Sequence, residues 1–211
     1  VPDPSARQVL DWLLPLMRTY GVETALELGA GWGSYTIELA KNCRAVDCVD
    51  ISRDVLDFIL RTGREEGCTN LRGIHQKWEA FTPQHTYDLV FGYNCFYRQA
   101  DLAECFARMD RAASRLCAAG MNTAEVPHWC RELEEAGGTL RWDWKNCGYF
   151  SGVLRQMGIE PGTVSMPFEK ECVYPDTEAL IRGECARFVP GSVPESAARE
   201  ILCRRFSRAP D

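Results

Sequence analysis

Residues 22–41 read VETALELGAGWGSYTIELAK, and this stretch decides the fold. The segment 22–28 has the character of a buried strand, three glycines follow at 29–33, and a helical pattern resumes at Ser34–Lys41. A glycine-rich bend between a strand and a helix lets an extended ligand pass close over the backbone, because glycine has no side chain and adopts positive φ readily. The stretch therefore predicts a ligand cradle at the carboxyl end of a strand.

Strand and helix patterns alternate outward from this bend, as far as residue 121. The expected strands are 22–28, 44–50, 71–75, 87–93 and 114–121, and the expected helices are 34–41, 53–66 (capped by Ser52) and 99–112. Short connections in this alternation are typical of an α/β fold, a doubly wound and mainly parallel sheet with helices on both faces. Sheets of this kind bind ligands at the carboxyl ends of their strands, where the strand order reverses.

The flanking segments complete the expected architecture. A helix is expected at 5–20, where Pro15 predicts a kink or two short helices. After the core come a helical, aromatic-rich insert, a strand at 163–173, and helices at 177–187 (capped by Asp176 or Thr177) and 194–206. We expect a single domain over 1–211, made of a cofactor-binding core at 1–122, a substrate-covering insert at 123–162, and a terminal strand and helices at 163–211.

Composition limits the class of partner. The chain has 211 residues, 45% of them hydrophobic, which is enough for one core. A net charge of -6 with scattered Lys and Arg lacks the basic stripe that nucleic acids require, although a role in tRNA modification stays open. Eleven cysteines without C-x-x-C pairs indicate reduced thiols rather than disulfides or structural zinc, and no apolar run reaches the roughly 18 residues that span a bilayer. We expect a cytoplasmic protein acting on a small molecule, with no nucleic-acid or membrane partner.

The spacing of the glycines separates two kinds of nucleotide cofactor. A dinucleotide site reads G-x-G-x-x-G, because a pyrophosphate lies on the helix N-terminus. Here the third glycine comes one residue early, and Glu27 precedes the first glycine by two places. A carboxylate pointing into the crevice would repel a pyrophosphate and suit a cofactor with a cationic amino group. This favours S-adenosylmethionine over NAD.

Asp50 is the second signal, since it ends the second predicted strand. A carboxylate at this place can accept hydrogen bonds from both hydroxyls of a ribose. The alternative is that Asp50 only caps the helix that follows.

Four segments together resemble the class I (Rossmann-like) S-adenosylmethionine-dependent methyltransferase family: ALELGAGWGSYTIELA, VDCVDIS, IHQKWEAF and YDLVFGYNCFY. The resemblance covers roughly residues 5–122 and is most specific in the first motif. It implies a seven-stranded sheet, S-adenosylmethionine as methyl donor and S-adenosylhomocysteine as product.

The resemblance also implies roles for individual residues. The amino-acid end of the cofactor would lie on the bend formed by Glu27, Gly29, Ala30, Gly31 and Gly33. Asp50 would bind the ribose, and Ile51 would pack on the adenine.

Two further segments bear on the cofactor. Where the family often has an acidic residue and a small one in the adenine loop, this sequence has Lys77 and Trp78, so Trp78 or its amide would lie against the ring and Glu79 is a substitute acceptor. Tyr93 and Asn94 stand where family members meet the methyl group and the substrate.

The substrate side is less specified, because methyl transfer to a good nucleophile needs positioning more than a base. Among His75, His85 and His128, we single out His128 as the base candidate beside Tyr93 and Asn94, against the simpler reading of a surface or capping histidine.

Other side chains could serve the acceptor or the core. An aromatic cage for a cationic amine, or simply core packing, would use Tyr93, Tyr97, Trp142, Trp144, Tyr149 and Phe150. Arg98 and Arg155 could clamp a carboxylate, although exposed arginines are common. The spacing of Cys147, Cys172 and His128 supports no metal site.

The sequence thus predicts methyl transfer to an oxygen, nitrogen or carbon atom of a small molecule. Two alternatives are a nicotinamide-dependent oxidoreductase on the same sheet and a catalytically silent scaffold subunit that keeps the cofactor pocket. The strand at 163–173 lacks a visible partner. Either the chain continues beyond residue 211 or a second copy, in a homodimer, covers the edge.

Overall fold

The structure is a computed structural model that describes residues 4–97, 99–122, 127–141, 148–167 and 172–206. The chain divides into two compact units. The first comprises 1–122 with 147–168, and the second comprises 123–146 with 169–211. Each unit has its own core and is described by itself.

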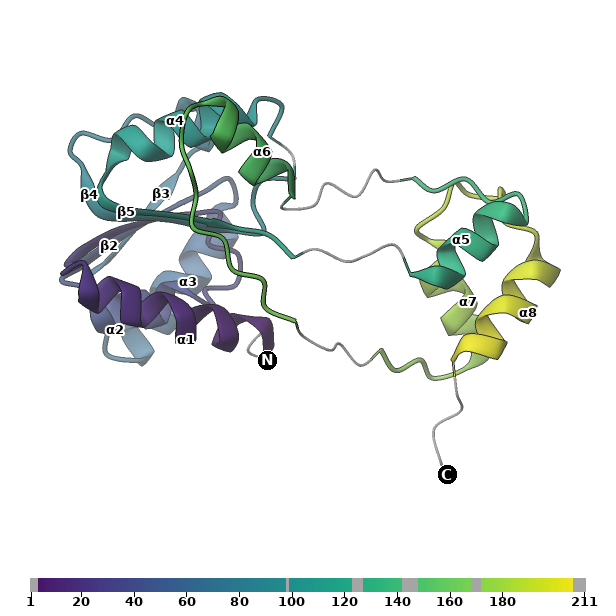
Figure 1. Cartoon of the computed structure of the whole chain (residues 1–211). Coiled ribbons are helices and arrows are strands. Elements are labelled where there is room, and N and C mark those ends of the chain that lie inside the picture. Colours follow the sequence, from purple (N-terminus) through teal and green to yellow (C-terminus); the bar gives the residue numbers. More distant parts are fainter. Residues whose placement is uncertain (1–3, 98, 123–126, 142–147, 168–171, 207–211) are drawn as a thin grey trace. The chain divides into compact units, whose positions relative to one another are not determined.

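The first unit is built on a parallel sheet of five strands (Figure 1). The strands are β1 (Thr24–Leu28), β2 (Ala45–Asp50), β3 (Leu71–His75), β4 (Tyr87–Tyr93) and β5 (Ala113–Gly120). Their order is β3-β2-β1-β4-β5, and every neighbouring pair is parallel. The order reverses between β1 and β4, so the carboxyl ends of these two strands flank the switch point. The predicted doubly wound α/β fold is confirmed.

Helices cover both faces of this sheet (Figure 1). They are α1 (Pro4–Thr19), α2 (Thr36–Asn42), α3 (Arg53–Glu65), α4 (Leu102–Ala112) and α6 (Gly148–Gln156). Side chains alternate along a strand, so each strand serves two cores. Ala25 and Phe91 face the core formed with α1, α2 and α3, whereas Leu26 and Val90 face the core formed with α4 and α6.

The first helix is single, and the prediction of two short helices is wrong. α1 runs through Pro15 without a break from Pro4 to Thr19. Its apolar stripe, which includes Val9, Leu13 and Met17, is almost fully buried in the first core. The free energy of that burial, of the order of 1.5–3 kcal/mol for each large side chain, outweighs the hydrogen bond that proline removes.

The second unit is a small cluster of helices. It contains α5 (His128–Glu135), α7 (Thr177–Cys185) and α8 (Glu195–Arg205) around a core that includes Leu133, Phe188 and Leu202. Asp176 caps α7 as predicted, since its Oδ1 accepts from the backbone N of Ala179 at 2.7 Å. An isolated antiparallel bridge joins Leu140 to Phe188.

The terminal strand expected at 163–173 is not found. The described residues 163–167 and 172–173 belong to no strand, and residues 168–171 lie outside the described part of the chain. Pro167 offers no N–H to a ladder. Instead Met166 packs against the first core, and Gln8 of α1 donates its Nε2 to the carbonyl of Pro167 at 3.3 Å. The described part of the sheet therefore has five strands rather than the seven implied by the resemblance.

The insert expected at 123–162 is divided between the units. Its first part, with α5, belongs to the second unit, and its last part, with α6, belongs to the first. Phe150 of α6 packs edge-on against Phe96 and Phe106, which fixes α6 over α4. The division between the two compact units thus does not follow the expected bounds of the insert.

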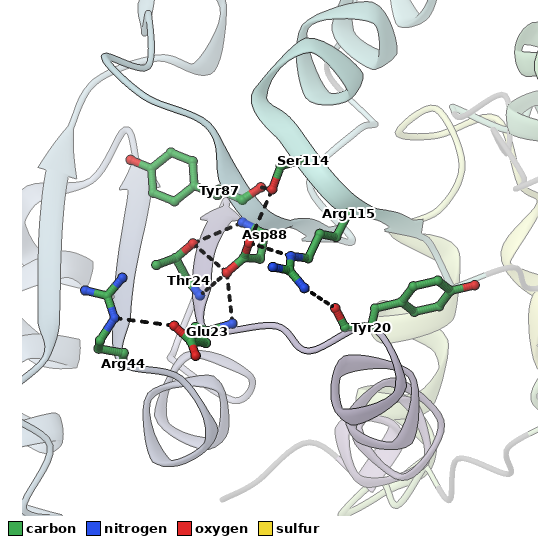
Figure 2. A network of polar contacts seen from close by, with 8 residues as sticks. All are labelled: Tyr20, Glu23, Thr24, Arg44, Tyr87, Asp88, Ser114 and Arg115. Atoms are coloured by element: carbon green, nitrogen blue, oxygen red, sulfur yellow. Dashed lines mark hydrogen bonds and ion pairs between the residues drawn. The ribbon is translucent and has the colours of Figure 1, made fainter.

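A polar network ties together the strand ends opposite the switch point (Figure 2). Asp88 of β4 accepts from the backbone N of Glu23 and of Thr24, both at 3.0 Å, and from the Thr24 hydroxyl at 3.2 Å. Its other oxygen pairs with Arg115 at 3.0 Å and accepts from the Ser114 hydroxyl at 3.3 Å. One carboxylate thereby joins the first residues of β1, β4 and β5.

This network sets the protonation of Asp88. Burial alone raises the pKa of the carboxyl group, but the backbone N–H groups of Glu23 and Thr24, the Thr24 hydroxyl and Arg115 together lower the pKa below its ordinary value. A lowered pKa contributes stability above the pKa of the unfolded chain, and that contribution is lost as the pH falls through the folded value.

We predict that Asp88→Asn lowers the free energy of unfolding at pH 7 by about 2–3 kcal/mol. The amide must turn its NH2 group either toward the N–H donors or toward Arg115, so one side of the network is broken. The deficit should shrink as the pH falls through the lowered pKa of Asp88, where the carboxyl group itself becomes protonated. Urea unfolding at pH 7 and pH 3 measures both effects.

Glu23→Gln is the matched control, because its side chain forms only an exposed ion pair with Arg44 at 3.7 Å. It should cost less than about 0.5 kcal/mol. Equal losses in the two variants would contradict the structural role given to Asp88.

Candidate active site

A cleft of about 1330 Å³ opens at the carboxyl ends of β1, β2 and β4. Its walls include the bend Gly29–Gly33, Asp50 and Ile51 after β2, Gln76–Glu79 after β3, and Tyr93 and Asn94 after β4. The predicted cofactor residues therefore meet at one cleft, apart from Glu27, which is treated below.

The glycines of the bend serve different purposes. At Gly29, with φ +64°, an added Cβ would lie 2.4 Å from the Cβ of Cys95, so no larger residue fits. At Gly31, with φ +52°, the nearest atom to an added Cβ is the carbonyl oxygen of Gly29, 4.0 Å away. The space over Gly31 is open, as a ligand that crosses the bend requires. Among the described residues no side chain comes within 4 Å of that added Cβ.

Glu27 lies beneath the bend rather than in the wall of the cleft. Its side chain is 2% exposed, and one carboxyl oxygen accepts from the Thr36 hydroxyl of α2 at 2.6 Å. Burial raises the pKa of Glu27 to about 8; the hydrogen bond from Thr36 opposes this rise, and the charge of Asp50 adds to it. The sequence predicted an ionised carboxylate pointing into the crevice. Instead the alternation along β1 turns this side chain toward α2, where burial favours its protonated form.

Asp50 faces the cleft at the end of β2. Its Oδ1 accepts from the backbone N of Ser52 at 2.8 Å, while Ser52 itself caps α3 by accepting from the backbone N of Val55 at 3.4 Å. The capping role proposed as an alternative for Asp50 is therefore filled by Ser52. Among the described residues no partner is found for Oδ2 of Asp50. The adjoining Ile51 is 60% exposed and offers an apolar surface in the same wall.

The loop after β3, which the resemblance predicts to lie against the adenine, contains a short 3-10 helix, η1 (Trp78–Ala80). Lys77, Trp78 and Glu79 all line the cleft, and Trp78 is also buried in the core. Arg108 of α4 donates its Nη2 to the carbonyl oxygens of Trp78, at 3.1 Å, and Phe81, and its guanidinium lies 5.4 Å from the Trp78 ring. Sequence analysis missed Arg108, because nothing in the spacing of α4 links it to a loop that lies about thirty residues earlier.

The substrate-side candidates separate into three groups. Tyr93, Asn94 and Tyr97 line the cleft. Phe150 is buried in the core, which was the alternative considered for it, and Arg155 forms an exposed ion pair with Glu160 at 2.9 Å. Arg98, Trp142, Trp144 and Cys147 lie outside the described residues.

His128 belongs to the second unit, where it begins α5. Its side chain is 76% exposed, and its Nδ1 lies 2.7 Å from Glu132. Glu132 also pairs with Arg204 and Arg205, and these groups, Arg205 first and then His128 and Arg204, lower the pKa of Glu132 to about 2. The described contacts of His128 are thus those of a surface histidine beside a carboxylate.

The described residues have the features of neither a metal site nor a membrane-spanning helix. No three His, Cys, Asp or Glu side chains converge there as metal ligands would. None of the described helices has both the length and the apolar character needed to cross a membrane.

Residues 25–115 match the family model described as "Methyltransferase domain". The match covers less than half of the chain and supports the predicted resemblance to S-adenosylmethionine-dependent methyltransferases. The matched region extends from β1 into the start of β5 and includes the bend, Asp50, the adenine loop and Tyr93. No protein with a curated description matches the chain in sequence.

Several solved structures are similar to this chain in fold. A putative sarcosine dimethylglycine methyltransferase from Galdieria sulphuraria gives a TM-score of 0.54 at 15% identity, over 75% of this chain and 67% of that one. DhpI in complex with SAH gives 0.50 at 18% identity, over 71% and 76%. An S-adenosylmethionine-dependent methyltransferase from Clostridium acetobutylicum gives 0.50 at 16% identity, over 63% and 55%. The chain spans 35% of a coclaurine N-methyltransferase that it also matches.

We predict that S-adenosylhomocysteine binding at pH 6.5 releases up to one proton from the wild-type protein and none from Glu27→Gln. At this pH the amino group of the ligand is cationic, and its charge above Glu27 favours loss of the proton that burial retains on the carboxyl group. Calorimetry in two buffers of different ionisation enthalpy measures the release.

The same group makes stability depend on pH without ligand. Because the folded pKa is raised, the contribution of Glu27 is present below its unfolded pKa and is lost as the pH rises toward about 8. The free energy of unfolding should therefore fall between pH 5 and pH 8, and Glu27→Gln should flatten this slope. The exposed Glu65→Gln is the control and should keep both effects; proton release that persists in Glu27→Gln would refute the assignment.

Proposed function

We propose that the protein transfers a methyl group from S-adenosylmethionine to an oxygen, nitrogen or carbon atom of a small molecule, leaving S-adenosylhomocysteine. The observation that carries the proposal is the open space over Gly31, in a backbone bend that shares one cleft with Asp50. A bare bend accepts an extended ligand, and an acid at the next strand end suits a ribose.

The cofactor would lie across three strand ends. Its amino-acid end would rest on Gly29, Ala30, Gly31 and Gly33, with Glu27 supplying a negative charge from below once it is deprotonated. The ribose hydroxyls would donate to Asp50, whose Oδ2 is available. The adenine would lie between Ile51 and the loop of Lys77, Trp78 and Glu79.

The bound cofactor would supply a sulfonium methyl, which leaves sulfur with the S–C electron pair staying on sulfur as the acceptor forms its new bond to carbon. A proton carried by the acceptor atom passes to solvent or to a nearby base. The contribution of the protein is alignment, and effective concentrations gained by alignment are large. Tyr93 and Asn94 are the proposed contacts at the reacting atoms. His128 is the third candidate, as a base.

A small acceptor fits the dimensions and the charge. The cleft of about 1330 Å³ must hold both cofactor and acceptor, and the net charge of -6 disfavours nucleic acid. We place the protein in the cytoplasm. In the described part of the chain β5 is an edge strand. We further propose that a second copy of the chain covers this edge, which sedimentation would reveal as a dimer.

Two alternative functions differ from the proposed one in what the same site would bind or produce. A nicotinamide-dependent oxidoreductase would bind NADH, which the glycine spacing disfavours. A silent scaffold would bind S-adenosylmethionine but yield no methylated product with any cell-extract metabolite.

We predict micromolar binding of S-adenosylhomocysteine and much weaker binding of NADH. Asp50→Ala should weaken S-adenosylhomocysteine binding by about 1–3 kcal/mol, because charge-assisted hydrogen bonds to the ribose are lost. Calorimetric titration of wild-type protein and variant measures both quantities.

Asp54→Ala is the matched control, since Asp54 lies in the first turn of α3, is exposed and is absent from the wall of the cleft. It should bind like the wild type. Micromolar binding of NADH alone would discard the proposed function, and unchanged affinity in Asp50→Ala would contradict the ribose contact.

A further inference from the structure

The ends of β4 and β5 are joined by three hydrogen bonds beyond the sheet. The Tyr93 hydroxyl donates to Oδ1 of Asn122 at 2.7 Å. The backbone N of Asn122 donates to Oδ1 of Asn94 at 2.6 Å, and the backbone N of Asn94 donates to the carbonyl oxygen of Gly120 at 3.0 Å. Asn122 is therefore bonded to both cleft residues proposed to meet the reacting atoms.

The backbone at Asn94 is held in an uncommon conformation. Its φ is +55°, and in the described part of the chain it is the one residue other than glycine with a positive φ. Such a conformation costs free energy and persists where the surroundings fix it. Because Oδ1 accepts from the backbone N of Asn122, the NH2 group of Asn94 must point the other way.

The ring of Tyr93 is fixed just as closely. A Cβ at Gly120 would lie 2.4 Å from Cδ2 of this ring, so the ring is seated directly on the backbone of β5. On another side the ring of Tyr35 lies 5.4 Å away between centroids. The ring can pack this closely on the backbone only because residue 120 has no side chain.

These contacts determine which polar group each residue presents. The hydroxyl proton of Tyr93 is directed at Asn122, so Tyr93 presents oxygen lone pairs to the cleft that it lines. Asn94, which also lines the cleft, presents N–H donors. Asn122 is not part of the cleft wall, so it acts through its two neighbours.

We infer that Asn122 is a positioning residue: by accepting the Tyr93 proton and donating to Asn94, it turns an acceptor oxygen and an amide donor toward the reacting atoms. This inference rests on the proposed function. An acceptor oxygen at this place attracts positively polarised hydrogens, namely those of a sulfonium methyl and those of an amine or hydroxyl nucleophile. A nucleophile that carries hydrogen is therefore the acceptor class that fits.

The test uses two cofactor analogues. S-adenosylhomocysteine lacks the methyl group, whereas sinefungin carries an amino group in its place. The ratio of the two dissociation constants reports what faces the methyl position, and it does not change when a variant only loosens the fold or the shared part of the site.

We expect Tyr93→Phe and Asn122→Ala each to weaken sinefungin about tenfold relative to S-adenosylhomocysteine, the loss of one charge-assisted hydrogen bond. The double variant should show no further loss, because both changes remove the same contact. Asn122→Asp, which keeps an acceptor for the Tyr93 hydroxyl, should retain or raise the preference for sinefungin. Asn42→Ala, at the end of α2, is the control and should behave as wild type.

The outcomes separate the two proposals. If the wild type binds S-adenosylhomocysteine but the ratio is the same in all variants, or if both ligands weaken equally, the inference is overturned while the proposed function stands. If the wild type does not bind S-adenosylhomocysteine, the proposed function fails, and the inference with it. Tyr93→Phe keeps the ring on Gly120, so it remains informative if Asn122→Ala does not fold.

Discussion

The close approach of Cys95 to the backbone of Gly29 is the constraint on which the site depends. A Cβ at residue 29 would lie 2.4 Å from the Cβ of Cys95, so the chain leaving β4 presses on the chain leaving β1. This contact brings the two strand ends of the switch point together. It also leaves Gly31 beyond the contact, with open space above it. Glycine is thus required at one position for packing and at the other for a ligand.

The two ends of the sheet have opposite tasks. At the amino ends, Asp88 gathers backbone donors from β1 and a guanidinium from β5, and its charge is satisfied. At the carboxyl ends, polar groups face a cleft. Burial raises the pKa of Glu27 there, and a cationic ligand bound above it would lower that pKa again. The hydrogen bonds and the ion pair of Asp88 join the strands at their amino ends, while the cleft lies at their carboxyl ends.

Much of the fold was predictable from sequence, because hydrophobic periodicity and the residues that cap helices or form turns act locally. β3 and β4 were predicted at their observed bounds, and Ser52 and Asp176 cap the helices expected of them. The bend and Asp50 were placed in one cleft. The sequence could not decide between a kinked helix and two short helices at Pro15, since the burial that offsets proline comes from tertiary contacts. The prediction of a strand at 163–173 was wrong for a similar reason, because Met166 packs against the core formed with α1, α2 and α3 rather than in the sheet.

The site shows the same limit. Residue type alone identified Glu27, but not that alternation along β1 and a hydroxyl on α2 would hold it beneath the bend. Arg108 and Asn122 form hydrogen bonds to residues far away in the sequence, and the spacing of residue types does not predict such contacts. The account is tested most directly by the crystal structure of the protein with S-adenosylhomocysteine. It predicts the amino-acid end over Gly31 and both ribose hydroxyls within about 2.7–3.2 Å of the Asp50 carboxylate; a ligand bound elsewhere, or a ribose turned away from Asp50, would contradict it.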